Sequence, residues 1–415
     1  MLPYTCTLCG CLCDDLEIRA DAGVVVEARG ACELARPKLV GLSVEPAVAP
    51  PCRVNGREVV ADEAVEAAAA ILAGANAPVV LRLERATNEA ARRAVALADR
   101  IGAAIEAGDA ATAWPRVVAM QRYGAVGATL GEVKARADVV VFWGCDPATT
   151  HPRHFERYSL PDRDGRRAIV LDATETDTAR RADVFLQVAP ERELDLLLTL
   201  RALAREAPLD PHRVETATGH GLATLQELVE TLQGARYGAW FTGSAAGRGA
   251  GSLVEARRQA VTALVRDLAR NTRLVTIGLG EAGNPHGAEG VMAWQTGFAP
   301  GVDLGAGFPE SWPGESSAAA RLARGAFDAA LVIGGPTSGA VPGGNPWIFI
   351  GDPGDEAFAL ATVALPAGTP GVDDAGTFTR VDGVSLPVRA LRAATMPGAT
   401  EWLERLRAAV GEEAP

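Results

Sequence analysis

Short apolar runs, each bounded by polar residues, alternate with longer amphipathic or alanine-rich stretches along most of this chain. Runs of this kind are typical of strands that are buried on both faces of a parallel sheet. Strands are expected at 78–83, 138–143, 168–171, 183–188, 238–242, 273–277, 329–333 and 347–350. Helices are expected at 62–73 (with Asp62 as N-cap), 88–101, 191–205 and 252–271. This alternation predicts an α/β protein with mostly parallel sheets.

The first 60 residues follow a different pattern. Two alternating segments, 16–19 and 24–28, flank the turn 21–23 and predict a β-hairpin. We expect a small β-rich lobe over 1–60, a first α/β lobe over 61–235 and a second over 236–415, with interleaving of the lobes left open. Segments 135–147 and 326–336 share a helix end, an aspartate, an apolar strand and a Gly/Pro loop. They suggest that the two α/β lobes are related.

Length and charge exclude several classes of protein. A chain of 415 residues is too long for one small domain. The net charge of −12 argues against a nucleic-acid partner, because a phosphate backbone requires a basic surface. The N-terminus lacks a signal-peptide pattern, and no apolar run approaches the roughly 18–20 residues of a membrane span. We therefore expect a cytoplasmic protein without a membrane partner.

Cysteines are crowded at the N-terminus. Cys6, Cys9, Cys13 and Cys32 have the spacing C-x2-C-x3-C-x18-C. In a reducing compartment such a cluster binds metal more often than it forms disulfides. Four thiolates suit either a [4Fe-4S] cluster or a closed tetrahedral zinc site, and the sequence does not choose between them.

The remaining cysteines have simpler interpretations. Cys11 lies between ligand positions and is either a spectator or an alternative ligand. Cys52 and Cys145 are expected to be small buried hydrophobic residues. Two other motifs are ambiguous. The glycine-rich turn 243–251 has the backbone to hold a phosphate but lacks a cluster of basic side chains. His151 and His154 have no carboxylate at ligand spacing and are expected to fix a loop or contact a subunit.

Several longer motifs carry a resemblance to the B subunit of formylmethanofuran dehydrogenase. They are Cys13-Asp-Asp15, the segment 129–138, Trp143-Gly-Cys-Asp-Pro147, the segment 151–158, Gly283-Asn284, Trp294-Gln-Thr-Gly297, Pro313-Gly-Glu315 and the segment 376–383. The resemblance implies the α/β fold of pterin-molybdenum and pterin-tungsten oxidoreductases, which is formate dehydrogenase-like, with Rossmann-like lobes. It also implies a [4Fe-4S] cluster and a bis-pterin metal held by the cysteine of a Cys-His-Gly-Pro loop.

The chain departs from that family at the metal ligand. The Cys-His-Gly-Pro loop should precede Met120, where this chain has Thr112-Ala-Trp-Pro115. No cysteine lies between Cys52 and Cys145. Without a soft thiolate, molybdenum or tungsten loses its protein anchor. We therefore expect no molybdenum or tungsten pterin and no catalytic residue, and Thr112 marks the vicinity of the lost ligand.

The resemblance is greatest to the B subunit of the bacterial formyltransferase/hydrolase complex, which converts formyl-tetrahydromethanopterin to formate through a methanofuran-type carrier. It implies a non-catalytic structural subunit beside an amidohydrolase, a formyltransferase and a β-helical subunit. Two alternatives remain. One is an active molybdenum or tungsten formylmethanofuran dehydrogenase subunit with an unusual ligand, such as an aspartate. The other is a free-standing iron–sulfur or zinc protein.

Overall fold

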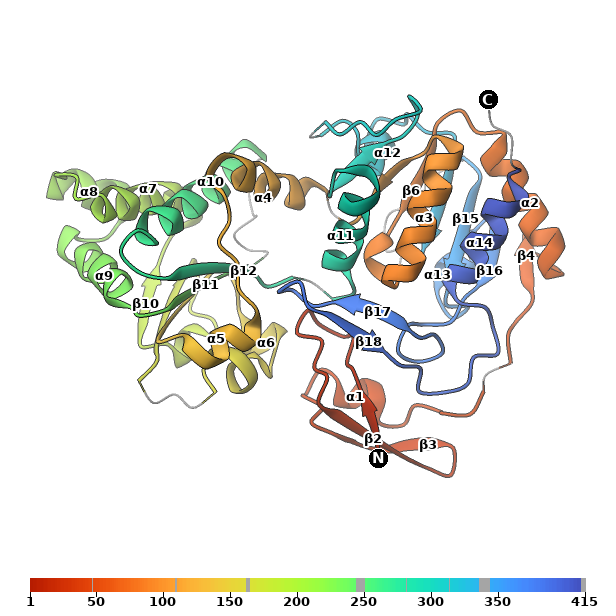
Figure 1. Cartoon of the computed structure of the whole chain (residues 1–415), viewed down its shortest axis with the longest axis horizontal. Coiled ribbons are helices and arrows are strands. Elements are labelled where there is room, and N and C mark those ends of the chain that lie inside the picture. The colour runs from red at the N-terminus through yellow and green to blue at the C-terminus, as the bar shows by residue number, and fades with distance from the viewer. Residues whose placement is uncertain are drawn as a thin grey trace. The chain divides into compact units, whose positions relative to one another are not determined.

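The chain divides into two compact units (Figure 1). The computed structural model describes residues 1–411 except 47, 109, 162–164, 244–250, 281, 313 and 336–343, and it describes only the backbone of 111, 112, 251 and 252. Unit 1 is formed by Met1–Ala110 and Ala282–Pro415, and unit 2 by Ala111–Glu281. Unit 2 is therefore inserted into unit 1, and neither coincides with the segments 61–235 and 236–415 of the sequence prediction.

Unit 1 is built on a mixed sheet with the strand order β13-β7-β6-β14-β15-β16-β4-β5. The five strands from β7 to β16 are parallel, whereas β13, β4 and β5 add to the edges in antiparallel pairs. In chain order the strands are β4 (Cys52–Val54), β5 (Arg57–Val59), β6 (Pro78–Leu81), β7 (Ala104–Glu106), β13 (Gly301–Asp303), β14 (Ala329–Ile333), β15 (Trp347–Gly351) and β16 (Val363–Pro366).

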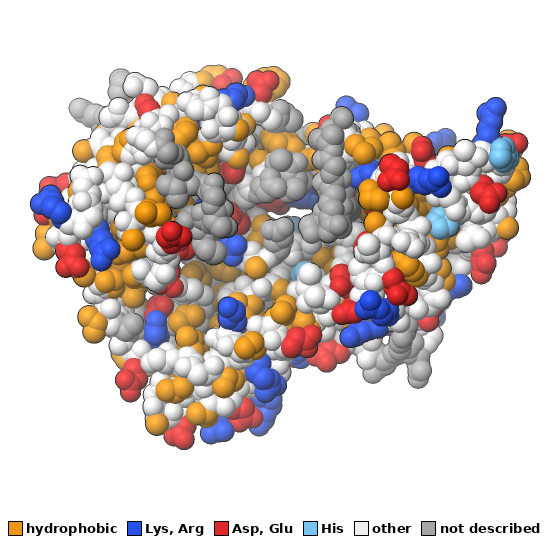
Figure 2. Space-filling view, turned by 180° about the vertical axis from the view of Figure 1, so that it is seen from behind, with side chains coloured by type: hydrophobic (Ala, Val, Ile, Leu, Met, Phe, Trp, Pro, Cys, Tyr) orange, Lys and Arg blue, Asp and Glu red, His pale blue; other side chains and the backbone are white. Residues whose placement is uncertain are grey.

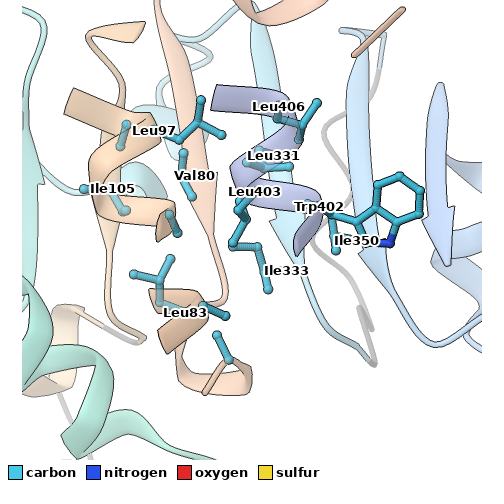
Figure 3. Packing of buried hydrophobic residues seen from close by; sticks show 14 of the residues in the cluster. Val80, Leu83, Leu97, Ile105, Leu331, Ile333, Ile350, Trp402, Leu403 and Leu406 are labelled. Carbon is cyan, nitrogen blue, oxygen red and sulfur yellow. The ribbon is translucent and has the colours of Figure 1, made fainter. Parts of the chain in front are cut away.

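Successive residues of a strand point to opposite sides of the sheet. The apolar residues of these strands therefore need cover on both faces, and helices supply it. Val80, Leu331 and Ile350 pack with one group of helices, as Figure 3 shows for Leu97, Leu403 and Leu406. That group is α2 (Ala61–Ala73), α3 (Asn88–Ile101), α11 (Pro285–Thr296) and α14 (Ala399–Ala409). Alternate strand residues pack on the other face against α12 (Ala318–Ala323) and α13 (Glu356–Leu360). Each buried Leu or Ile contributes about 1.5–3 kcal/mol.

The N-cap predicted for α2 was wrong. Val60 has the extended backbone of an N-cap residue, and no side chain caps this helix end. Asp62 instead lies in the first turn, where a carboxylate favours the positive end of the helix dipole. Its Oδ1 accepts a hydrogen bond from Arg405 of α14 at 2.7 Å.

Unit 2 contains a fully parallel sheet with the order β10-β9-β8-β11-β12. Its strands are β8 (Val139–Trp143), β9 (Arg167–Asp172), β10 (Val184–Gln187), β11 (Gly238–Thr242) and β12 (Leu274–Gly278). One face packs against α7 (Glu193–Ala204), α8 (Pro211–Thr218), α9 (Leu222–Gly234) and α10 (Gly251–Leu268). On the other face Phe142 contacts Phe155 of a π-helical turn and stacks on Phe241.

The sequence echo between 135–147 and 326–336 falls on β8 and β14. Each strand lies next to the switch point of its sheet, where the order in which successive strands are added reverses. Sheets of this kind usually bind ligands at that point. However, β8 precedes β9 and β10 on one side of its switch point, whereas β14 begins the opposite side of the other sheet. The two strands therefore resemble one another locally without occupying equivalent positions.

Helix length and composition also bear on membrane insertion. Within the part of the chain that the structure describes, no helix is both long enough and apolar enough to cross a bilayer.

A buried amide joins three elements of unit 1. The Asn284 side chain is fully buried and donates from Nδ2 to the carbonyl of Ala86 (3.0 Å) and to Oδ1 of Asn88 (2.8 Å). Its Oδ1 accepts the backbone N–H of Thr379 at 2.7 Å, in β17 (Gly376–Thr379). This contact attaches the hairpin of β17 and β18 (Ser385–Val388) to the start of α3 and α11.

We predict that Asn284→Ala lowers the free energy of unfolding by about 2–4 kcal/mol, because it leaves buried donors and acceptors unpaired. The measurement is urea denaturation beside the exposed control Gln295→Ala, which should remain within about 0.5 kcal/mol of wild type. Equal stability of the two variants would contradict the role assigned to this network.

Candidate metal centre

The N-terminal lobe is a small antiparallel sheet of β1 (Leu2–Tyr4), β2 (Leu16–Asp21) and β3 (Val24–Arg29). Its inner face buries few side chains, among them Leu16, Ile18 and Val25. Its outer face carries the ion pairs Arg19–Glu27 and Arg29–Glu17, both at 3.1 Å and exposed. Exposed pairs contribute little stability, and small lobes commonly depend on disulfides or metals.

Three of the four predicted ligands lie on the loop that connects β1 to β2. Tyr4 pairs with Leu16, so the sheet closes the loop at its base. The backbone N–H of Cys6 donates to the carbonyl of Cys13 at 2.9 Å, and that of Leu12 donates to the carbonyl of Cys9 at 3.2 Å. These bonds fold the segment 6–13 into a compact turn.

Leu12 anchors this turn on unit 1. Its φ of 39° is unusual for a residue with a side chain, and such a backbone costs about 1–2 kcal/mol. The strain is offset because Leu12 is fully buried against Phe378 and Val388 of the β17–β18 hairpin. The backbone N–H of Val381 also donates to the carbonyl of Gly10 at 3.2 Å. The conformation of Leu12 therefore directs its own side chain into the apolar contact.

The fourth predicted ligand, Cys32, comes from the segment before the short helix α1 (Arg36–Leu39). Its carbonyl accepts the N–H groups of Ala35 and Arg36, which fixes the backbone at this position. Burial, together with the charges of Cys9, Cys13 and Cys32, raises the pKa of the Cys6 thiol to about 12. Cys6 is therefore near enough to the other three predicted ligands to feel their charges, and the binding of one metal by all four stays a prediction.

A fifth thiol lies beside Cys9. The Sγ atoms of Cys9 and Cys11 lie within 4.8 Å of one another. A hydrogen bond from the Cys11 side chain lowers the pKa of Cys9 to about 7 and outweighs its burial. Cys11 is only 1% exposed. Cys9 and Cys11 form part of a candidate metal site, and its geometry does not identify the metal. The sequence signal for their proximity is the C-x-C spacing.

The expected position of the lost redox ligand lies at the start of α4 (Ala110–Tyr123). The side chain of Thr112 is outside the described part of the chain. Trp114 is buried, and its indole N–H has no hydrogen-bond partner among the described residues. Pro115 lies inside the helix. This segment offers a bulky indole and a proline, and neither is a metal ligand.

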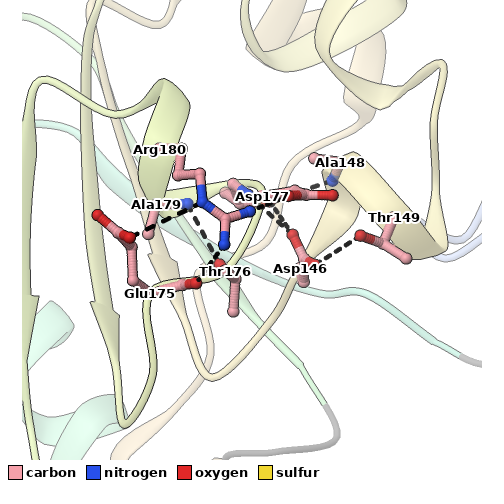
Figure 4. A network of polar contacts seen from close by, with 9 residues as sticks. Asp146, Ala148, Thr149, Glu175, Thr176, Asp177, Ala179 and Arg180 are labelled. Atoms are coloured by element: carbon pink, nitrogen blue, oxygen red, sulfur yellow. Dashed lines mark hydrogen bonds and ion pairs between the residues drawn. The ribbon is translucent and has the colours of Figure 1, made fainter.

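Cys145 belongs to a loop that is fixed by hydrogen bonds at the end of β8 (Figure 4). Oδ1 of Asp146 accepts the N–H of Thr178 at 2.9 Å, and Oδ2 accepts the Thr149 hydroxyl at 2.7 Å. The Cys145 thiol is buried and contacts the carbonyl of Phe241 at 3.8 Å. Burial raises the pKa of this thiol, so the thiolate that a metal requires is disfavoured.

The two histidines of the segment 151–158 are buried within unit 2. The His151 ring contacts the hydroxyl of Thr150 (2.9 Å) and the carbonyl of Gly280 (3.2 Å). His154 Nδ1 contacts the hydroxyl of Ser159 at 2.9 Å. Burial lowers the pKa of His151 to about 4 and that of His154 to about 3, so both rings are neutral at pH 7.

Most of the glycine-rich turn 243–251 lies outside the described residues. Gly243 itself is described, and a Cβ placed there would lie 2.3 Å from the Cβ of Cys145. Close packing of two loops therefore explains the glycine at this position, and its phosphate-binding role stays untested.

The fold is that of the pterin-dependent oxidoreductases. Acetylene hydratase from Pelobacter acetylenicus superposes with a TM-score of 0.67 over 98% of this chain and 69% of that chain, at 12% identity. That identity supports the fold alone. The formyltransferase/hydrolase complex FhcABCD from Methylorubrum extorquens, solved with methylofuran, contains a chain with a TM-score of 0.71 and 26% identity. The match covers 86% of this chain and 98% of that one.

Sequence relatives narrow the class to a family. The B subunit of the tungsten-containing formylmethanofuran dehydrogenase 2 of Methanocaldococcus jannaschii is 32% identical over 406 residues, which is 92% of either chain. The B subunit of the formyltransferase/hydrolase complex Fhc of Methylorubrum extorquens is 28% identical over 84% of this chain and 93% of its own length. No protein-family model matches the chain. The chain belongs to the family of formylmethanofuran dehydrogenase B subunits, as its motifs predicted.

We predict that Cys13→Ser lowers the melting temperature by several degrees and removes the bound metal, because structural metal binding is coupled to folding of the lobe. Calorimetry and metal analysis of the chain purified together with its partner subunits provide the measurement. The matched control is Cys52→Ser, whose thiol is also buried but packs in the core of unit 1. A Cys13→Ser protein that keeps its metal and its melting temperature would contradict the ligand assignment.

Proposed function

We propose that this chain is a non-catalytic structural subunit of a formyltransferase/hydrolase complex, in which the oxidoreductase fold persists without its redox centre. The observation that carries the proposal is the absence of any cysteine between Cys52 and Cys145. This interval includes the start of α4, where the family has its metal ligand. Molybdenum or tungsten would therefore lack the thiolate ligand that this loop supplies in the family.

The chemistry of formyl transfer would then belong to partner subunits. In this proposal the complex moves the formyl group of formyl-tetrahydromethanopterin to a methanofuran-type carrier and hydrolyses it to formate. The partners are an amidohydrolase, a formyltransferase and a β-helical subunit. The likeness to a chain of the solved formyltransferase/hydrolase complex supports this assignment, since that match covers 98% of the solved chain.

The alternative is an active tungsten or molybdenum subunit with an unusual ligand. Relatives named as tungsten-containing match this chain at 32% and 30% identity, which keeps the alternative open. The described part of α4 does not favour it. Trp114, two residues after Thr112, is a buried indole without a ligating atom.

We further propose that the four cysteines hold one structural metal centre. All four belong to the described residues, and no three of their sulfur atoms lie within 4.8 Å of one another. A tetrahedral zinc ion with Zn–S bonds of about 2.3 Å would hold them about 3.8 Å apart. An iron–sulfur cluster is larger than a single ion and holds its thiolates further apart, and either centre would be bound by four thiolates.

Surface composition supports a subunit role. Trp294 (70% exposed), Trp312 (63%) and Phe308 (58%) are large apolar side chains open to solvent in unit 1. Figure 2 shows hydrophobic side chains among the charged ones over one face. Apolar side chains that gather into a contiguous exposed patch mark sites of protein association, and these three are the candidates for partner contacts.

We predict that the chain aggregates or binds a hydrophobic dye when it is expressed alone, and co-purifies in equal ratio when it is co-expressed with the three proposed partners. Size-exclusion chromatography with light scattering measures both outcomes. A well-behaved monomer that does not associate with those partners would refute the subunit assignment.

We also predict that the assembled complex shows no formate-dependent dye reduction, because no thiolate is available to hold a redox metal. The matched variant is Thr112→Ala, which should leave formyl transfer and hydrolysis unchanged. Formate-dependent dye reduction that disappears in Thr112→Ala would establish the alternative function.

A further inference from the structure

The loop that carries the proposed ligands contains one more thiol than a four-thiolate centre requires. Cys9 and Cys11 are separated only by Gly10, and their sulfur atoms lie within 4.8 Å. Cys9 and Cys11 therefore present neighbouring sulfurs within the lobe.

The turn geometry accounts for this pairing. The Leu12 N–H donates to the carbonyl of Cys9, and the Val381 N–H donates to the carbonyl of Gly10. Leu12, in its left-handed conformation, directs its side chain toward Phe378 and Val388. The backbone of the segment 9–12 is thus fixed on the β17–β18 hairpin, and the turn brings both thiols together.

The surroundings of Cys11 differ from those of an ordinary buried cysteine. Cys52 packs among the aliphatic side chains that form the core of unit 1. Cys11 is equally buried but does not belong to the apolar contact made by Leu12, Phe378 and Val388. Its thiol instead hydrogen-bonds that of Cys9. The Cys11 sulfur therefore lies beside a second soft donor, the Cys9 thiol.

We propose that Cys11 is a second soft donor for the ligand position of Cys9, so that Cys6, Cys13 and Cys32 complete the centre with either thiol. The inference rests on the metal centre proposed above. A four-coordinate site uses one of the two thiols at a time, and the other stays within hydrogen-bonding reach. Serine does not replace either thiol, because its hard oxygen is a poor ligand for metals that prefer thiolates.

The test compares metal content among variants of the co-expressed complex. Cys9→Ser and Cys11→Ser should each retain metal within about twofold of wild type, because the remaining thiol occupies the position. The double variant Cys9→Ser/Cys11→Ser should lose at least about tenfold, as should Cys13→Ser. Cys52→Ser is the control for loss of a buried thiol and should retain its metal.

Two readouts keep the outcomes distinct. Metal per chain is measured by elemental analysis, and assembly by the ratio of co-purified subunits. The proposed exchange between Cys9 and Cys11 at one ligand position would be overturned if Cys9→Ser alone lost metal or assembly. Full metal retention in the double variant would overturn it as well. A wild-type complex that assembles without metal would overturn the centre itself, and the exchange with it. Failure of the wild-type chain to associate with its proposed partners would refute the proposed function, while the metal contents of the purified variants would still decide the exchange.

Discussion

Parallel strands are stable only when both of their faces are covered. This constraint determines the packing inside each of the two units. In unit 1, residues such as Val80 and Leu331 face one layer of helices, while Val79 and Ala330 face the other. Unit 2 repeats the arrangement around β8 and β11. The stabilising contacts are apolar and lie within the sheets and helices. The loss of a redox ligand proposed for the start of α4 would leave these contacts intact, so the fold could persist without that chemistry.

The cysteine lobe follows a different physical principle. Its sheet buries few apolar side chains on the inner face. Its outer face carries exposed ion pairs, which contribute little stability. Leu12 attaches it to the β17–β18 hairpin, and clustered thiols occupy the interior of the loop. A metal that cross-links these thiols would supply the folding energy that the small core lacks. A structural requirement would therefore explain why four thiolates are kept in a chain for which we propose no redox ligand.

Local patterns in the sequence predicted much of the fold. The strands β8 and β14 are continuous apolar runs, and α3 has both a capping threonine and the predicted bounds. Strands such as β4 and β7 were missed because they have only three residues and derive their stability from neighbours distant in sequence. The insertion of unit 2 was left open for the same reason.

The candidate site was partly predictable. The C-x2-C-x3-C spacing is local, so the four cysteines could be chosen from the sequence. The place of Cys11 depends on the positive φ of Leu12, and that backbone is stable only because Phe378 and Val388 bury the leucine. Contacts between residues so distant in sequence do not appear in a motif. The burial of Trp114 likewise depends on packing around α4.

The central claim is that this member of the family holds a structural metal at its cysteines and has no redox metal. Elemental analysis of the complex purified from cells grown with molybdate and tungstate tests it most directly. The account predicts iron or zinc bound to this chain and neither molybdenum nor tungsten above trace level. Molybdenum or tungsten at one atom per chain would contradict it.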